Sequence, residues 1–430
     1  MNARRQPRGL RLPKAPNVSR RDLLQLGAVA AAGVFVGGNV LAACGGDDDN
    51  AGGTSPGTGG TTPGTTAGTT AGTTAGTTAG TTPGTAPGSS AATTGSGPAL
   101  DVLRLGFAYI GPINDNGWTQ EHHRGRQYVF DTLGDKVTGK FVENVLFDPA
   151  QTTPIFEDLA ANHDFVIANT EYATLLSDVA KQYPDVHFLE CDGHTYLDNL
   201  YSYYVRHVQP TYALGVAAAM LNQGSPTKIG YIGAFPTATA YNDVNGLVLG
   251  ARTIDPEATV QAVMISSFFD PPKATSAANA LLAEDINFLF AVMDEPSFLQ
   301  VANDAGVWAA AWNTDVREFG PDVYVNTLQL DFGPYYLEQA NAALAGTWTA
   351  KTQPDLLPLD LGDWGDKVPA DVSSAVDELR PQLLDESLNP YTGPIVDNQG
   401  KERVADGETL DAQQAYLIDW AAEGVSGVDG

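Results

Sequence analysis

From about residue 100 onward, the sequence predicts an α/β protein built on parallel sheets. Short apolar runs, typical of buried strands, alternate with segments in which apolar residues recur at helical spacing. Such alternation is typical of parallel sheets joined by right-handed helical crossovers. The alternation occurs in two successive runs. We therefore predict two Rossmann-like lobes with a cleft between them.

The expected strands follow one another along the whole of this region. They are Leu103–Ile110, Phe141–Leu146, Phe165–Ala168, His187–Glu190, Leu200–Tyr204, Lys228–Ile232, Val260–Met264, Phe288–Val292, Gly306–Ala311 and Val323–Thr327. The expected helices between them are Glu121–Leu133, Ile155–Ala161, Thr174–Gln182, Thr211–Asn222, Asn242–Thr253, Ala274–Ala283, Pro296–Ala305 and Pro334–Ala345. Neither run contains a glycine-rich dinucleotide or phosphate-loop fingerprint.

The expected lobe boundaries follow from the two runs. Lobe 1 is expected at 100–209, completed by about 328–430, and lobe 2 at 210–327. The chain would cross between them near 206–210 and again near 327–333.

The composition excludes several classes of protein. The 23 basic and 51 acidic residues give a formal net charge of −28, and seven of the basic residues lie ahead of Cys44. So acidic a surface repels nucleic acid and anionic lipid headgroups, which argues against DNA binding. Cys44 and Cys191 are the two cysteines, so a framework of disulfides is not expected.

The N-terminal segment predicts export and a lipid anchor. The stretch SRRDLL at 19–24 resembles a twin-arginine export signal, an apolar segment follows, and LAAC at 41–44 resembles a lipoprotein box. We expect residues 1–43 to be a signal peptide, removed after export by a twin-arginine or Sec route. The alternative is an uncleaved transmembrane anchor. After cleavage, by contrast, Cys44 would be the first residue and would carry the lipid on the outer face of the cell membrane.

Residues 44–99 have the composition of a tether. Near-repeats of GTTA and GTTP run from Gly57 to Gly88, with no large apolar residue and no Lys or Arg. Such a segment has nothing to bury, so we expect a disordered, Thr-, Gly-, Pro- and Ala-rich linker. Its function would be to hold the globular part clear of the membrane.

The stretch from Leu103 to Gly125, LRLGFAYIGPINDNGWTQEHHRG, predicts a ligand-binding corner. An apolar strand leads into a Gly-Pro turn and a polar loop, and a helical pattern begins with Thr119 as the expected N-cap. Loops at the carboxyl ends of parallel strands are where α/β proteins bind ligands.

Several short motifs, in order, resemble one family. They are GPI at 111–113, GW at 117–118, KIGYIGAFP at 228–236, NGLVLGA at 245–251, SFFDP at 267–271, FGP at 319–321, GPYY at 333–336 and GPIVD at 393–397. Together they resemble the basic membrane protein (BMP) family, lipoprotein substrate-binding components of ABC importers similar to purine-nucleoside receptors. The resemblance implies a type I periplasmic-binding fold and a purine nucleoside or nucleobase as the ligand.

A purine has two π faces and an edge of hydrogen-bond donors and acceptors, so its site needs aromatic plates with carboxylates and amides at the rim. The candidate plates are Trp118, Tyr172, Phe235, Phe268 and Phe269. The candidate polar groups are Asp115, Asn116, Asn245, Asp294, Asn313 and Asp315, with Asn169 as a further amide. Each aromatic side chain also fits core packing, and each Asn also fits a turn.

Three further patterns have alternative readings. Asp294-Glu295-Pro296 resembles a helix N-cap followed by Pro at the first helical position, which is compatible with a ligand role for the second carboxylate oxygen. His122 and His123 are adjacent on a helix and point about 100° apart, so a metal site is not expected there. Cys191 fits a buried small hydrophobe better than a nucleophile.

The sequence thus predicts a monomeric, lipid-anchored solute-binding protein that closes its lobes on a purine and delivers it to an ABC permease. It needs no cofactor and is not an enzyme. The same fold binding a sugar, riboflavin or another heterocycle is one alternative. A domain that senses a ligand and signals to a membrane partner is another, and a hydrolase of the same outline is a third.

Overall fold

The structure, a computed structural model, describes residues 97–428. The expected signal peptide (1–43), the lipidation site Cys44 and all but the last residues of the expected tether (44–99) lie outside the described residues. Between residues 97 and 428, no helix combines the length and the apolar character that crossing a membrane requires.

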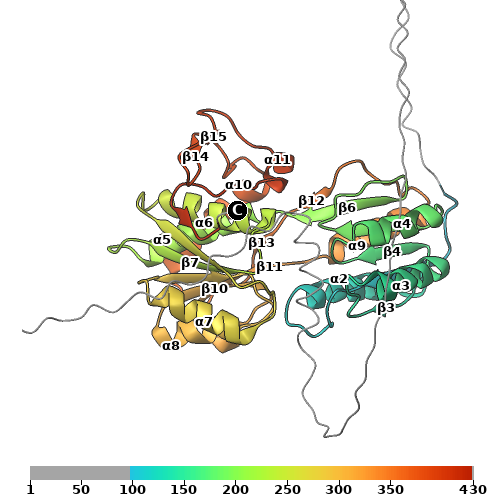
Figure 1. Ribbon diagram of the computed structural model, residues 1–430, viewed down its shortest axis with the longest axis horizontal. Coiled ribbons are helices and arrows are strands. Elements are labelled where there is room, and N and C mark those ends of the chain that lie inside the picture. Colours follow the sequence, from blue (N-terminus) through green and yellow to red (C-terminus); the bar gives the residue numbers. More distant parts are fainter. Residues whose placement is uncertain (1–96, 429–430) are drawn as a thin grey trace, which may run out of the picture. The chain divides into compact units, whose positions relative to one another are not determined.

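Two seven-stranded sheets organise the described chain (Figure 1). Sheet 1 has the order β12-β6-β5-β4-β1-β2, with β3 also paired to β1. Its strands are β1 (Leu103–Ala108), β2 (Val137–Thr138), β3 (Phe141–Val142), β4 (Phe165–Ala168), β5 (His187–Cys191), β6 (Leu200–Val205) and β12 (Asp355–Leu357), all paired in parallel.

Sheet 2 has the order β13-β11-β10-β9-β7-β8-β16. Its strands are β7 (Lys228–Gly233), β8 (Thr259–Met264), β9 (Phe288–Ala291), β10 (Trp308–Asn313), β11 (Tyr324–Gln329), β13 (Asp360–Leu361) and β16 (Val425–Ser426). All of its pairs are parallel except the antiparallel pair of β13 with β11. A separate hairpin joins β14 (Ile395–Val396) to β15 (Glu402–Val404).

The helices accompany the two sheets in separate groups (Figure 1). Sheet 1 is accompanied by α2 (Trp118–Leu133), α3 (Pro149–Asn162), α4 (Thr174–Gln182) and α9 (Gly333–Leu344). Sheet 2 is accompanied by α5 (Val208–Leu221), α6 (Ala238–Arg252), α7 (Pro271–Leu282) and α8 (Ser297–Ala305). Near the C-terminus α10 (Ala370–Leu384) packs on α5, and the short α11 (Ala412–Tyr416) packs on α6. The predicted α/β architecture of two parallel-sheet lobes is confirmed.

The described chain passes between the two sheets three times. It leaves sheet 1 after β6, returns from β11 through α9 to β12, and leaves again into β13. Residues 328–430 were expected to complete lobe 1. Within the described part of this range, α9 and β12 belong with sheet 1, whereas β13 and β16 join sheet 2. Short edge strands such as β13 and β16 carry too little hydrophobic pattern to be assigned to a sheet from sequence.

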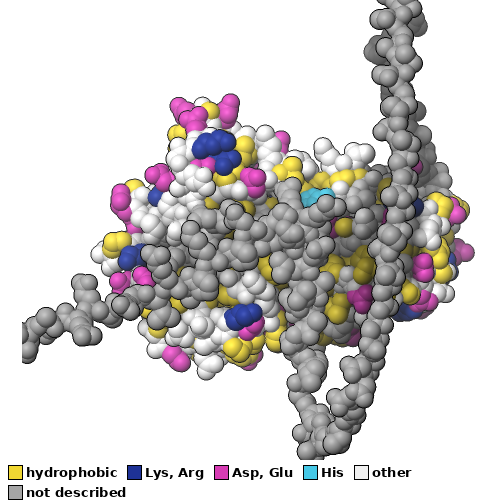
Figure 2. Space-filling model, viewed as in Figure 1, with side chains coloured by type: hydrophobic (Ala, Val, Ile, Leu, Met, Phe, Trp, Pro, Cys, Tyr) yellow, Lys and Arg dark blue, Asp and Glu magenta, His cyan; other side chains and the backbone are white. Residues whose placement is uncertain are grey.

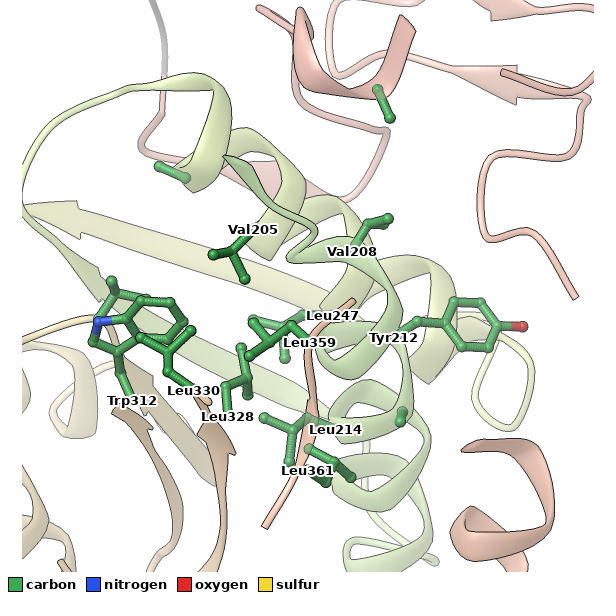
Figure 3. Packing of buried hydrophobic residues seen from close by; sticks show 14 of the residues in the cluster. Val205, Val208, Tyr212, Leu214, Leu247, Trp312, Leu328, Leu330, Leu359 and Leu361 are labelled. Carbon is green, nitrogen blue, oxygen red and sulfur yellow. The ribbon is translucent and has the colours of Figure 1, made fainter. Parts of the chain in front are cut away.

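A large apolar cluster lies where α5 meets the strands around it. Helix α5 is buried on nearly every side, because sheet 2, α6 and α10 all pack against it. Figure 3 shows Leu214 of α5 beside Leu328 and Leu361, with Trp312 at the edge of the cluster next to Leu330. Trp312 therefore has one side in the core, which holds the orientation of its ring.

The acidic composition is visible at the surface. On the face shown in Figure 2, acidic side chains are scattered across the described surface, while Lys and Arg occur in a few isolated groups. The exposed ion pairs include Arg104–Asp164 and Lys181–Asp178. Pairs of this kind contribute little to stability. The surface thus agrees with the charge of the sequence.

Candidate ligand-binding site

The candidate site lies where loops from the carboxyl ends of the two sheets meet. The loop after β1 leads into α2 on the sheet 1 side, and the loops after β9 and β10 lie opposite on the sheet 2 side. The main-chain N–H of Trp118 donates to Oδ1 of Asp294 across this junction, at 3.1 Å. Arg124 of α2 also reaches Oγ1 of Thr314, at 3.4 Å. The two lobes are thus in direct polar contact.

Asp115 shapes the loop before α2. Its carboxylate accepts hydrogen bonds from three main-chain N–H groups, those of Gly117 (2.9 Å), Thr119 (2.9 Å) and Gln120 (3.0 Å). These are among the amides that a helix N-terminus leaves without partners. The predicted N-cap, Thr119, instead lies inside the helix, which begins at Trp118. Asp115 is therefore held by the loop itself.

Asp294 completes the capping of α2 from the other lobe. Its Oδ1 accepts a hydrogen bond from the main-chain N–H of Trp118 and another, at 2.8 Å, from Nδ2 of Asn313. The sequence suggested that Asp294 caps the helix that follows it. However, α8 begins at Ser297, and Glu295 accepts the Ser297 N–H at 2.8 Å. Asp294 therefore caps a helix of the opposite lobe, which nothing in its local sequence indicates.

The electrostatic surroundings of Asp294 are unusual for an aspartate. The pKa of Asp294 is raised to about 7, chiefly by burial and also by the nearby charge of Asp115, while the hydrogen bonds from Trp118 and Asn313 lower it. Close approach is possible because residue 117 is glycine: a Cβ there would lie 2.2 Å from Asp294 Oδ1. Both of these hydrogen bonds go to Oδ1, and no group within residues 97–428 donates to Asp294 Oδ2. The Oδ2 atom is therefore available to a ligand.

Two tryptophans from opposite lobes face each other beside Asp294. The indole rings of Trp118 and Trp312 are within 15° of parallel, with centroids 6.3 Å apart. Trp118 is fixed by the hydrogen bond from its Nε1 to the carbonyl oxygen of Asn169, at 2.7 Å. Trp312 has His207 against it, with centroids 4.6 Å apart. The pair presents aromatic faces of both lobes to the same space.

Asn313 supplies a buried acceptor next to this pair. It adopts φ +70° directly after Trp312, a left-handed conformation that non-glycine residues seldom adopt and that is frequent at functional sites. Its side chain is fully buried, and because Nδ2 is committed to Asp294, the amide orientation is set. Oδ1 has no hydrogen-bond partner in residues 97–428. A buried acceptor of this kind needs a water molecule or a ligand as its partner, and its place beside the two indoles makes it available to a ligand.

The predicted phenylalanines form an exposed group at the lobe 2 edge of the junction. Phe235 and Phe268 are in edge contact, with centroids 5.8 Å apart. Phe268 is 47% exposed and Phe269 is 54% exposed. The N–H of Asp294 donates to the carbonyl oxygen of Phe268 at 2.9 Å, which places this group beside the carboxylate. Exposed aromatic side chains at this position are available to cover a ligand.

Asn116, the remaining predicted residue of this loop, is exposed at φ +56°. Its position next to Asp115 is at the rim of the junction.

Three predicted site residues lie elsewhere in the structure. Tyr172 is 2% exposed and donates its hydroxyl to the carbonyl oxygen of Val145, in a core cluster of sheet 1. Asn245 is fully buried in α6, where its side chain bonds the main chain of Trp420 and Ala422. Asp315 is an exposed partner of Arg317. Tyr172 thus belongs to a core, Asn245 binds the C-terminal segment and Asp315 forms a surface ion pair. None of the three belongs to the candidate site.

The structure also brings in residues that were not predicted as site residues. Trp312 follows the expected strand Gly306–Ala311 and was not named as a site residue, although its place near the carboxyl end of β10, next to Asn313, could have identified it. Behind it, Nδ1 of His207 lies 2.9 Å from Asp243 Oδ1, and Asp243 Oδ2 accepts the hydroxyl of Tyr231 at 2.9 Å. Asp192 also lies close enough to His207 for their charges to interact, and burial raises the pKa of Asp192 to about 6. No sequence pattern links these residues.

The described chain contains no group of three or more His, Cys, Asp or Glu side chains that could hold a metal ion. His122 stacks on Phe332 with centroids 3.8 Å apart, while His123 lies against Phe141. Cys191 is buried, and burial raises the pKa of its thiol. These three side chains take part in packing.

Comparisons with known proteins identify the family. The sequence model of the Bmp family, described as "ABC transporter substrate-binding protein PnrA-like", matches residues 102–353. A protein of Brucella abortus named purine-binding protein is 31% identical over 344 residues, which cover 77% of this chain and 95% of the relative. A protein of Haloferax volcanii, with the provisional name of ABC transporter glucose-binding protein, is 31% identical over 317 residues, covering 72% of this chain and 80% of the relative.

A solved structure supports the fold. The solute-binding protein of an ABC transporter system from Conexibacter woesei aligns with a TM-score of 0.54 at 22% identity, covering 67% of this chain and 98% of that one. The fold is that of type I periplasmic-binding proteins, as the sequence implied. The Bmp family consists of substrate-binding proteins of ABC transporters, which act outside the cytoplasm and are not enzymes. The chain belongs to the Bmp family of ABC transporter substrate-binding proteins.

Proposed function

We propose that this protein captures a purine nucleoside or nucleobase between its two lobes and delivers it to an ABC permease from a lipid anchor at Cys44. The observation that carries the proposal is the pair of parallel indoles, Trp118 and Trp312, supplied by opposite lobes. A planar ring in van der Waals contact with both of two flanking rings needs about 7 Å between them, since carbon atoms pack at roughly 3.5 Å. A shift of the two indole rings, with the bond between the Trp118 N–H and Asp294 kept, would create this space.

The polar groups around the indoles suit the edge of a heterocycle. Asn313 Oδ1 is a buried acceptor without a partner in the described chain, and the hydrogen bonds that Asp294 accepts from Trp118 and Asn313 both go to its Oδ1, which leaves Oδ2 for a ligand. A ligand that fills this space should present N–H or O–H donors to them, as the amino groups and ring N–H of purines or the hydroxyls of a ribose do. The Brucella relative, named for purine binding, supports the same ligand class.

Lobe closure would couple ligand capture to transport. The three passages between the sheets are the places where the lobes can rotate. The ligand favours the closed form only if it binds that form more tightly than the open form. Trp118 and Asp115 belong to one lobe, and Trp312, Asn313 and Asp294 to the other, so the site is complete only when the lobes meet.

A hexose is the second candidate ligand. The Haloferax relative has the provisional name of a glucose-binding protein, and aromatic faces with carboxylate acceptors also suit sugar rings. The two candidates differ in how they use the indoles, because a purine is flat and has two π faces whereas a pyranose ring is puckered.

Calorimetric titration and thermal shift, on the full chain, test the proposal. The panel contains guanosine, adenosine, inosine, their free bases, riboflavin, ribose and glucose. We expect a purine to bind and to raise the melting temperature. Trp312→Ala should weaken that binding about 5- to 150-fold, since a stacked base contributes about 1–3 kcal/mol. Phe319→Ala is the control, because Phe319 lies on the same lobe and is 41% exposed. Binding of glucose but of no purine would refute the purine assignment.

A further inference from the structure

The C-terminal segment, residues 385–428, extends beyond the part of the chain that the family model matches, which ends at residue 353. It is tied firmly to the second lobe. Asn242 of α6 donates to the carbonyl oxygen of Ala415 at 2.9 Å. Strand β16 lies parallel to β8, with Val425 opposite Val260. The segment is therefore a fixed part of the lobe that contains sheet 2.

Besides Glu386, which pairs with Arg206 directly after β6, the side chain of Tyr416 connects this segment to the opposite lobe. The hydroxyl of Tyr416, the last residue of α11, lies 2.8 Å from Nδ1 of His194 and 3.3 Å from the carbonyl oxygen of Gly193, to which it donates. Its ring lies 4.5 Å from that of Tyr204 in β6. His194, Gly193 and Tyr204 all belong to sheet 1 or to the loop after β5. Tyr416 is only 6% exposed, whereas its partner His194 is exposed, so the contact lies at the edge of the buried region.

Both sides of this contact are held in place. On the tail side, Asp411 and Gln414 form a reciprocal capping box that fixes α11. On the lobe 1 side, residue 193 is glycine because the loop packs closely: a Cβ there would lie 2.2 Å from Glu190 Oε2 and 2.8 Å from Ser202 Oγ. The contact thus joins two ordered elements.

The loop that Tyr416 contacts leads directly to the candidate site. Asp192 precedes Gly193, adopts φ +58°, and interacts electrostatically with His207. His207 in turn packs against Trp312. When lobe 2 moves away from lobe 1, the Tyr416 hydroxyl must leave this loop, because the tail moves with α6.

We propose that Tyr416 is a latch that holds the lobes closed and slows ligand release. The inference rests on the lobe closure proposed above, but it does not depend on which ligand binds. Tyr416 acts through the position of the 192–196 loop and need not contact the ligand. It is therefore a positioning residue, and the C-terminal segment, by carrying it, becomes part of the closure mechanism.

Hydrogen–deuterium exchange of the full chain without ligand provides the first test. Tyr416→Phe keeps the ring and removes the hydroxyl, so exchange should become faster in the loop peptide covering 192–199, while peptides of α6 stay unchanged. Leu417→Ala, which truncates the exposed neighbouring side chain, is the control. Unchanged exchange in the loop would overturn the proposal. So would equal acceleration in α6, because it would show that the variant only loosens the tail.

Ligand release provides the second test. With guanosine as the probe and stopped-flow tryptophan fluorescence as the signal, Tyr416→Phe should release the nucleoside about 5- to 10-fold faster, as expected for the loss of the hydrogen bonds of a buried hydroxyl. His194→Ala should accelerate release as well, and the double variant should add little to either single one. Fully additive effects would refute a direct contact. If the native protein fails to bind guanosine, the proposed purine ligand fails, whereas the exchange experiment still decides about the latch.

Discussion

A single methyl group at residue 117 should keep the two lobes from closing. In the structure a Cβ added to Gly117 would lie 2.2 Å from Oδ1 of Asp294, 2.7 Å from its Cγ and 2.8 Å from its Cβ. Ordinary contacts of a Cβ begin at about 3.4 Å. The lobes must therefore separate by about 1 Å at this point, because the closely packed atoms around residue 117 leave no free space for the added methyl group.

The separation has a predictable effect on binding. It would lengthen the bond between the Trp118 N–H and Asp294, now 3.1 Å, to about 4 Å, which is beyond hydrogen-bond distance. A hydrogen bond to a charged group contributes about 1.5–3 kcal/mol. At about 1.4 kcal/mol per factor of ten, Gly117→Ala should weaken ligand binding roughly 10- to 150-fold. The melting temperature without ligand should change little, because the clash lies between lobes and not within one.

Calorimetric titration with guanosine measures the affinity of each variant, and thermal melts without ligand measure its melting temperature. Gly97→Ala is the matched control, because the added methyl has no atom within 4 Å there. The double variant Gly117→Ala/Asp294→Gly should bind as Asp294→Gly does, since the three atoms nearest to the added Cβ all belong to the side chain of residue 294. Native affinity in Gly117→Ala would refute the reasoning, because it would show that the lobes do not close through this contact.

The remaining predictions concern pH, the tail and the exposed rings. Burial raises the pKa of Glu190 to about 8, so folding binds a proton there, and the stability that this group supplies at low pH is lost as the pH rises through 8, by up to about 1.4 kcal/mol per pH unit. Between pH 5.5 and 8.5 the melting temperature of Glu190→Gln should therefore rise relative to that of the native protein. A constant difference between the two would contradict the raised pKa of Glu190. Asn245→Ala removes the side-chain bonds to Trp420 and Ala422, so denaturant unfolding should show a loss of about 1–3 kcal/mol; native stability would mean that the tail is not anchored there. Phe268→Ala should weaken purine affinity several-fold by titration, and an affinity equal to the native value would exclude this ring from the ligand.

Much of the fold followed from local sequence patterns. The strands of both sheet cores and the helices between them were placed by hydrophobic periodicity, because each element must bury one face. Their ends were less accurate: α2 begins at Trp118, before the expected cap at Thr119, because Asp115 supplies the capping bonds from three residues upstream of the helix. The small strands β12, β13 and β16 were missed, since two or three residues carry no readable period.

The candidate site was only partly predictable. Polar and aromatic residues at strand ends were identified by position, and Trp118, Asp294 and Asn313 are indeed adjacent. The same rule also selected Tyr172, which lies in a core, because a strand end alone does not determine which way a side chain points. It overlooked Trp312, because the expected strand stopped at Ala311 and the parallel pairing with Trp118, almost 200 residues away in the sequence, leaves no local signal.

The sequence by itself determined the fold class, the acidic surface and the family, because periodicity, composition and ordered short motifs are local properties of the chain. Only the tertiary structure decided which groups face each other across the lobes. Asp294 resembles the cap of its own helix, yet it caps α2 of the other lobe, and Tyr416 in the C-terminal segment contacts a loop 222 residues earlier. Such pairings depend on how two separately folded lobes meet, and no local pattern encodes that geometry.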